Sequence, residues 1–130
     1  MLPKPLRLRS RRDFKQVYQR GQTVSLPTMV LYWRKNGGLG KRIGFSVSKK
    51  LGGAVERNRV KRRCRAAAHE LLPKCPSGFD LVFVARPAAA KADYSHLQAD
   101  MAQTLALAAQ KREHGKKSHS KKGASREAKI

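Results

Sequence analysis

The sequence predicts an α+β fold in which helices pack on a four-stranded sheet within a single domain. Two kinds of pattern support this prediction. In some short segments, bounded by Gly, Pro and Asn, apolar residues alternate or form a continuous run, which is typical of strands. In others they recur every three or four residues, which is typical of helices packed along one side. The segments follow one another in the order helix, three strands, helix, strand, helix.

The N-terminal segments are predicted to be an arm and a short helix. Residues 1–9, interrupted by Pro and Arg, are expected to form an irregular arm. Ser10 can then cap a helix that Gly21 ends. Three apolar residues of this helix recur at i, i+3 and i+4: Phe14, Val17 and Tyr18.

Three strands are expected next, at residues 22–25, 28–34 and 41–48. Residues 36–40, Asn-Gly-Gly-Leu-Gly, are typical of a hairpin turn, so the strand at 41–48 is expected to return beside the one at 28–34. One face of the returning strand is apolar, with Ile43, Phe45 and Val47. The other face is small and polar, with Gly44, Ser46 and Ser48. A ligand chain could lie on this small face, or the face could simply be solvated.

The second half is predicted to contain two helices around one strand. Turned at 100° per residue, the helix near residues 55–72 has an apolar side formed by Val60, Cys64, Ala67, Ala68 and Leu71. Residues 79–85 are almost continuously apolar, which favours a strand in the centre of the sheet, covered on both faces. Asp93 or Ser95 can cap the last helix. Its apolar side contains Leu97, Met101, Leu105 and Ala108. The domain is therefore expected to span residues 1–110, and the tail at 111–130, rich in Lys, Ser, His and Gly, is expected to be disordered.

The charge of the chain indicates a polyanionic partner. Its formal net charge is +22 and its pI is about 11.2. Residues 111–130 contribute only +6 of this charge, so the predicted domain is itself strongly basic. The two cysteines, Cys64 and Cys75, do not form a C-x-x-C pair, so neither a zinc site nor a disulfide framework is expected. The N-terminus has no signal-peptide pattern and no segment is long enough to span a membrane, so we expect a soluble cytoplasmic protein.

The strongest candidate for a binding site is the start of the second helix. A Lys-Lys-Leu-Gly-Gly turn at residues 49–53 leads into a helix with many bases and only two acids, Glu56 and Glu70. Like charges at i, i+4 destabilise an isolated helix, and a phosphate backbone would neutralise them, whereas the plainer interpretation is a solvated face. Apart from these two acids nothing neutralises the bases of the helix, which are Arg57, Arg59, Lys61, Arg62, Arg63 and Arg65. The candidate phosphate-binding residues are Lys49, Lys50, Arg57, Asn58, Arg59, Lys61, Arg62 and Arg65.

Aromatic residues form a second candidate site. Phe14, Tyr18 and Tyr32 could be core residues, or their rings could stack on unpaired bases if the first helix packs beside the strand at 28–34. Catalytic and metal-binding patterns are lacking: the four histidines do not match known metal-site spacings, and the acids outside the tail are scattered. Asp13 and Asp93 are interpreted as helix-start residues. Residue chemistry therefore favours binding over protein-based phosphodiester cleavage.

These motifs together resemble the protein subunit of bacterial ribonuclease P over residues 6–109. The matching stretches are Arg7-Leu8 with Asp13-Phe14, Val17-Tyr18 and Gly21; Val30-Leu31-Tyr32; Gly44-Phe45-Ser46-Val47-Ser48-Lys49-Lys50; Arg57-Asn58-Arg59; and Asp80-Leu81-Val82-Phe83-Val84-Ala85-Arg86. Tyr18 stands where phenylalanine is also common, and the long basic tail has no clear counterpart in the family.

The resemblance implies a protein subunit of an endoribonuclease whose catalytic site lies in an RNA. One protein would bind each catalytic RNA through the eight residues of the basic helix and its turn. The 5′ leader of precursor tRNA would lie in a cleft lined by Phe14, Tyr18, Tyr32 and Phe45. Mg²⁺ would be held mainly by the RNA, and no tightly bound cofactor, protein-bound metal or catalytic side chain is expected in this chain. A left-handed β-α-β crossover is also implied, contrary to the general rule for such units.

Two other functions stay open at this point. A general RNA-binding module, such as a small ribosomal protein, could use the same basic helix on duplex RNA. A protein-only endonuclease could use His69 with one of the scattered carboxylates.

Overall fold

The computed structural model describes residues 6–8 and 10–117, and it confirms the α+β class and the predicted order of elements. The elements are helix α1 (Arg11–Arg20), strands β1 (Gln22–Ser25), β2 (Met29–Lys35) and β3 (Arg42–Val47), helix α2 (Ala54–Glu70), strand β4 (Phe79–Ala85) and helix α3 (Tyr94–Lys117). Three 3₁₀ turns connect them: η2 (Lys49–Leu51), η3 (Leu72–Lys74) and η4 (Pro87–Lys91).

The strands form one sheet in the order β1-β2-β4-β3. The predicted central position of β4 is confirmed, because β4 pairs with β2 on one side and with β3 on the other. The predicted hairpin between β2 and β3 is wrong, since β4 lies between them. Turn residues such as those at 36–40 indicate only that the chain reverses. The apolar strand β4 occupies the position between β2 and β3, where both of its faces are covered.

Strand β3 runs parallel to β4, and α2 connects the two, so β3, α2 and β4 form a β-α-β unit. The left-handed sense of this crossover stays a prediction from the family resemblance.

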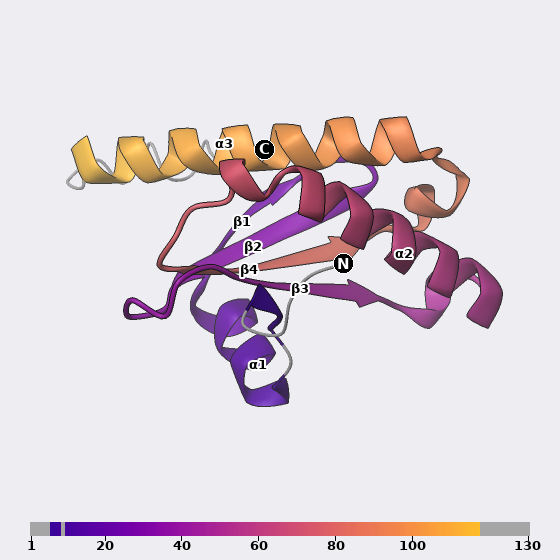
Figure 1. The fold of residues 1–130 in the computed structure, drawn as a ribbon, viewed down its shortest axis with the longest axis horizontal. Helices are drawn as coiled ribbons and strands as arrows, with labels where there is room; N and C mark the ends of the chain where they lie inside the picture. Colours follow the sequence, from indigo (N-terminus) through magenta and orange to yellow (C-terminus); the bar gives the residue numbers. More distant parts are fainter. Residues whose placement is uncertain (1–5, 9, 118–130) are drawn as a thin grey trace.

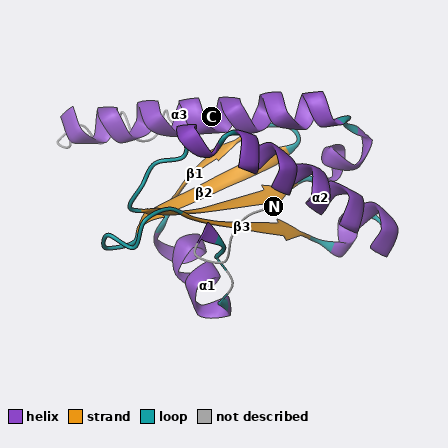
Figure 2. Cartoon of the chain, viewed as in Figure 1, coloured by secondary structure: helices purple, strands orange, loops and turns teal. Residues whose placement is uncertain are grey.

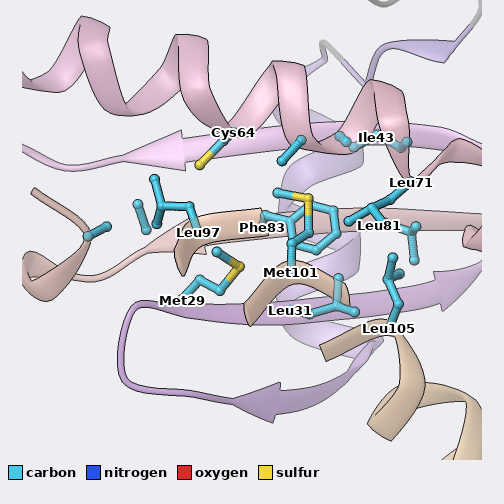
Figure 3. Packing of buried hydrophobic residues seen from close by; sticks show 14 of the residues in the cluster. Met29, Leu31, Ile43, Cys64, Leu71, Leu81, Phe83, Leu97, Met101 and Leu105 are labelled. Atoms are coloured by element: carbon cyan, nitrogen blue, oxygen red, sulfur yellow. The ribbon is translucent and has the colours of Figure 1, made fainter. Parts of the chain in front are cut away.

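Helices cover both faces of the sheet. Figure 1 shows α2 and α3 on one face and the shorter α1 on the other, and Figure 2 shows the same layers coloured by type of element. The larger core lies under α2 and α3, where Phe83, Leu81, Met29 and Leu31 pack against Met101 and other residues of the helices (Figure 3). The predicted apolar sides of both helices are buried: Val60, Cys64, Ala67 and Ala68 on α2 with Leu71 at its C-cap, and Leu97, Met101, Leu105 and Ala108 on α3.

A smaller core lies under α1. The Ser10 hydroxyl accepts hydrogen bonds from Arg12 N and Asp13 N at 3.1 and 3.3 Å, so the predicted cap is confirmed. Val17 is fully buried with Leu8 and Val82. Leu8 was expected in an irregular arm, but its N–H donates to Ile43 O at 2.9 Å beside β3. Pairing with a strand thus orders residues 6–8, while residues 1–5 and 9 of the predicted arm lie outside the described part.

Helix α3 begins at its predicted cap, where the Asp93 carboxylate accepts from His96 N at 2.9 Å, but it continues beyond residue 110 to Lys117. The helix therefore runs past the domain boundary expected at residue 110. Lys111 Nζ donates to Thr23 O at 2.8 Å and lies 5.6 Å from the Trp33 ring centre, and the Arg112 guanidinium lies 5.1 Å from the Phe79 ring centre. These cations bind the sheet through carbonyl and aromatic contacts that apolar periodicity does not reveal. Residues 118–130 of the predicted tail lie outside the described part of the chain.

The two cysteines are buried and free, and burial raises the pKa of each thiol from 9.0 to about 11. The folded state therefore favours the protonated thiols. Their contribution to stability is fully present below pH 9 and is lost as the pH rises through about 11. We expect each thiol to lower the free energy of unfolding by about 2 to 3 kcal/mol over this interval. Urea unfolding at several pH values should show that the free energy of unfolding of a Cys64→Ala/Cys75→Ala variant falls less steeply with pH than that of the wild type. Equal slopes of this free energy against pH would contradict this account.

Candidate nucleic-acid interface

The basic turn and helix follow directly from the C-terminal end of β3. The Ser48 hydroxyl accepts from Lys50 N at 3.3 Å and starts η2, so Lys49 and Lys50 are exposed on a defined turn. Gly52 has a φ of 141°, which residues with an L side chain rarely adopt, and the chain turns here before α2 begins. Glu56 Oε1 then accepts from Gly53 N at 3.0 Å and caps the first turn of the helix.

Helix α2 presents its bases to solvent on the side opposite its buried apolar side. Asn58, Arg59, Arg62 and Arg65 are exposed, and Arg57 and Lys61 are half-buried. The two acids of α2 are engaged elsewhere: Glu56 in the cap, and Glu70 with the Tyr94 hydroxyl at 2.8 Å and with Gln98. In the part of the chain whose side chains are described, no carboxylate forms an ion pair with a base of α2. All eight predicted phosphate-binding residues thus belong to one continuous segment, η2 and the outer side of α2.

Arg63 differs from the other bases of this helix. Its guanidinium donates to Ala92 O at 2.9 Å, and this bond connects α2 to the chain that leads into α3. We therefore interpret Arg63 as a structural residue.

Three of the four predicted aromatic residues come together on the sheet face that α1 covers. Tyr18 packs edge-on against Tyr32, with ring centres 5.0 Å apart and an interplanar angle of 80°. The ring centres of Phe14 and Tyr18 are 6.3 Å apart. The Phe14 ring packs directly on Gly44 of β3, where even an added Cβ atom would collide with this ring. Tyr18 remains 38% exposed, whereas Phe14 and Tyr32 are half-buried. We call Phe14, Tyr18 and Tyr32 the aromatic cluster.

Phe45 does not belong to the aromatic cluster. It packs against the core under α2 and α3, and its ring stacks on Phe83 with the centres 6.0 Å apart and the planes at 19°. Consecutive residues of a strand point to opposite faces, so Phe45 lies on the other face of β3 from its neighbour Gly44, on which Phe14 packs. The prediction that Phe45 lines the same surface as the three other rings is therefore wrong.

The face bearing the aromatic cluster continues as a half-exposed row across all four strands. The pairing places Ser25, Val30, Val84 and Ser46 side by side in this row. The next row along the strands contains Tyr32, Val82 and Gly44, which lie with the rings under α1. The small polar side of β3 predicted from the sequence therefore does lie beside the aromatic cluster, near the strand end that leads to η2.

An ionic network under α1 was missed from the sequence. Asp80 of β4 is only 2% exposed, and its two carboxylate oxygens accept from Arg42 Nε and Nη2, both at 2.8 Å. Asn36 Nδ2 also donates to Asp80 at 3.0 Å, and Arg42 Nη1 reaches Asp13 of α1 at 3.3 Å. The carboxylates raise the pKa of Arg42, chiefly through the hydrogen bonds to Asp80. The one acid within an otherwise apolar strand was the available signal, because a buried carboxylate requires a partner.

Every acid among the residues with described side chains has a hydrogen-bonding partner within the protein. Besides those named above, Asp93 caps α3 and Asp100 accepts from the Thr28 hydroxyl at 2.7 Å. No group of three or more His, Cys, Asp or Glu side chains that could hold a metal ion was found among the described residues. His69 is exposed on α2. No described helix is both long enough and apolar enough to cross a membrane.

Comparison with known proteins identifies the family. The sequence model of the family described as Ribonuclease P matches residues 2–109. The ribonuclease P protein component of Caldanaerobacter subterraneus subsp. tengcongensis is 40% identical over 105 residues, which cover 81% of this chain and 90% of that relative. The component of a Cyanothece species is 39% identical over 125 residues, with 83% and 95% covered. The chain belongs to the ribonuclease P protein family.

Solved structures of ribonuclease P proteins share this fold. A Staphylococcus aureus RNase P protein, a mutant with defective mRNA degradation activity, superposes with a TM-score of 0.73 at 32% identity, covering 81% of this chain and 89% of that one. The Thermotoga maritima RNase P protein gives a TM-score of 0.70 at 31% identity, with 76% and 94% covered. As a ribonuclease P protein, the chain is the protein subunit that serves in removal of the 5′ leader from precursor tRNA, and a general RNA-binding module is not favoured.

Proposed function

We propose that this ribonuclease P protein binds the catalytic RNA through η2 and α2, and the precursor's 5′ leader through the aromatic cluster, while the RNA carries out the cleavage. The observation that carries the proposal is the outer side of α2, where the bases lack carboxylate partners among the described side chains. Phosphates would supply the missing negative charge. Arg57 supports this assignment, because its Nε is shielded from solvent and has no hydrogen-bond partner among the described residues.

The leader contact rests on the exposure of the aromatic cluster and the row beside it. Unpaired bases stack on aromatic rings without strong sequence preference, as a leader of variable sequence requires. The row of Ser25, Val30, Val84 and Ser46 lies beside the row that contains Tyr32, and its β3 end is near η2. It offers small side chains on which a single strand can lie. Mature tRNA lacks the leader, so this contact would distinguish precursor from product.

The remaining parts of the proposal concern the chemistry and the assembly. Mg²⁺ would be held mainly by the RNA, since each acid among the described side chains already has a partner within the protein. We propose one protein for each RNA, a cytoplasmic location, and no catalytic side chain in this chain.

Reconstitution tests the proposal. Purified protein is added to a bacterial ribonuclease P RNA at low Mg²⁺ and release of the 5′ leader is followed over time. We expect no cleavage by the protein alone, slow cleavage by the RNA alone, and faster cleavage by the two together, because the protein supplies charge neutralisation and leader contacts. Cleavage by protein freed of all RNA would instead support the protein-only endonuclease, and a lack of stimulation would contradict the proposed assembly.

Tyr18→Ala tests the leader contact most directly, because this ring is the most exposed of the three and its loss opens little of the core. Loss of one stacked base should weaken precursor binding by about 1 to 3 kcal/mol, or about 5- to 150-fold, and leave mature tRNA binding unchanged. The measurement is the affinity of the assembled holoenzyme for each tRNA, together with a thermal melt of the free protein.

Phe45→Ala is the matched control, since Phe45 lies on the other face of the sheet. It should lower the melting temperature and affect both tRNAs alike. If Tyr18→Ala weakened the binding of precursor and mature tRNA by the same factor, this result would contradict the leader contact.

A further inference from the structure

Helix α1 carries two rings of the aromatic cluster, yet it has a small apolar anchor. It is ten residues long, and Val17 is its one buried residue. Among the residues that the structure describes, the core beneath it contains only Leu8, Val17 and Val82 as buried members, with Phe14, Tyr32 and Val84 partly buried around them. By contrast, the core under α2 and α3 contains more than twenty residues. So small an apolar contact leaves the position of α1 on the sheet weakly determined.

Polar contacts supply the missing anchor. The Arg42 guanidinium uses Nε and Nη2 to bind both oxygens of the buried Asp80, and it directs Nη1 to Asp13 in the first turn of α1. The fork of a guanidinium has a fixed planar geometry, so Arg42 held by Asp80 offers its third nitrogen in one direction. Asn36 Nδ2 further fixes Asp80 and also donates to Gly40 O at 2.8 Å. The acceptor in β4 thereby determines where Asp13 can lie.

The same anchor bears directly on the aromatic cluster. Asp13 precedes Phe14, and the Phe14 ring packs on Gly44, two residues after Arg42 on the same face of β3. Tyr18 follows Phe14 by four residues and packs on Tyr32. We infer that Arg42 is a positioning residue, which joins Asp13 to Asp80 so that the Phe14 and Tyr18 rings keep the place in which they receive the leader. This inference rests on the proposed leader contact.

Asp13→Asn is the test variant, because simple electrostatics and the positioning role predict opposite signs. The substitution removes one negative charge beside a polyanion, so electrostatics alone would strengthen binding of both tRNAs. If Arg42 positions α1 through Asp13, the holoenzyme should instead bind precursor about two- to fivefold more weakly, the range that a partly exposed ion pair can supply, and bind mature tRNA as before. The Asp13 side chain is 32% exposed, so the protein should melt near the wild-type temperature.

Two further variants complete the experiment. Asp93→Asn removes the same charge from the start of α3, on the other face of the sheet, and should not weaken precursor binding. In a Phe14→Ala background, Asp13→Asn should have a smaller additional effect than in the wild type, because it can then act only through Tyr18 and residues that act through one another are not additive. Arg42→Lys, which keeps the charge but loses the fork, should reproduce the selective loss of precursor binding.

Each outcome decides the inference. The positioning role is overturned if Asp13→Asn binds precursor as tightly as the wild type or more tightly. If Tyr18→Ala still loses precursor binding alone, the leader contact remains supported. Full additivity of Asp13→Asn with Phe14→Ala likewise overturns the positioning role. If Tyr18→Ala and Phe14→Ala do not distinguish precursor from mature tRNA, the leader contact itself is wrong and the positioning role falls with it.

Discussion

Replacing Arg59, Arg62 and Arg65 together by alanine should markedly reduce the salt dependence of binding to the catalytic RNA. All three side chains are exposed and lack carboxylate partners among the described residues. Each lost phosphate contact lowers the slope of log affinity against log salt by about one unit. With a combined change of about three units, the fall in affinity between 50 and 200 mM salt should shrink by about 60-fold.

The measurement is a filter-binding or fluorescence titration of the RNA at several salt concentrations. Single variants should each change the slope by about one unit, and circular dichroism should be unchanged because these side chains lie away from the buried side of α2. Arg63→Ala is the matched control on the same helix. Because Arg63 binds Ala92 O, this variant should lower the melting temperature and change the salt slope least. Wild-type slopes in all three single variants would place the RNA contact elsewhere.

Asp80→Ala should destabilise the protein strongly. Breaking a buried ion pair by removing one partner costs about 3 to 5 kcal/mol, and Arg42 would keep only its longer contact to Asp13. Asp80 binds Arg42 through two 2.8 Å hydrogen bonds and Asn36 through a third, and its side chain is 3% exposed. For a domain of this size the melting temperature should fall by about 10 °C or more.

Two comparisons make this result specific to the buried pair. Asp93→Ala removes an exposed helix cap and should cost about 1 kcal/mol. A double variant, Asp80→Leu with Arg42→Met, replaces both charges by apolar groups of similar size and should recover much of the lost stability. If Asp80→Ala were no more destabilising than Asp93→Ala, the network under α1 would not contribute as proposed.

Local sequence patterns identified the elements and most of their buried sides. The apolar periodicity of α2 and α3 identified the residues that are buried, and the continuous apolar run of β4 identified the central strand. Such patterns succeed because burial of one side of an element is a local requirement that each segment must satisfy. The basic segment from Lys49 to Arg65 could also be identified, since its eight candidate residues lie close together along the chain and the Arg57-Asn58-Arg59 motif of the family lies among them.

The position of Phe45 was predicted differently by the strand pattern and by the family resemblance. Its alternation with Gly44 and Ser46 already placed Phe45 on the apolar face of its strand, whereas the family resemblance suggested a place beside the leader. The structure agrees with the alternation, because Phe45 stacks on Phe83 under the helices.

The tertiary structure alone decided which elements are neighbours. A turn at residues 36–40 specifies a reversal of the chain, but the pairing of β2 and β3 with β4 depends on residues 38 to 56 positions away. The same holds for Arg42, which joins Asp13 and Asp80, and for Lys111 and Arg112, which bind the sheet through Thr23 O, Trp33 and Phe79. The apolar periodicity of a segment indicates which of its sides must be buried. It carries no information about the distant residue with which each polar group forms a hydrogen bond. The strand order, the network under α1 and the last turns of α3 therefore became visible only in the folded chain.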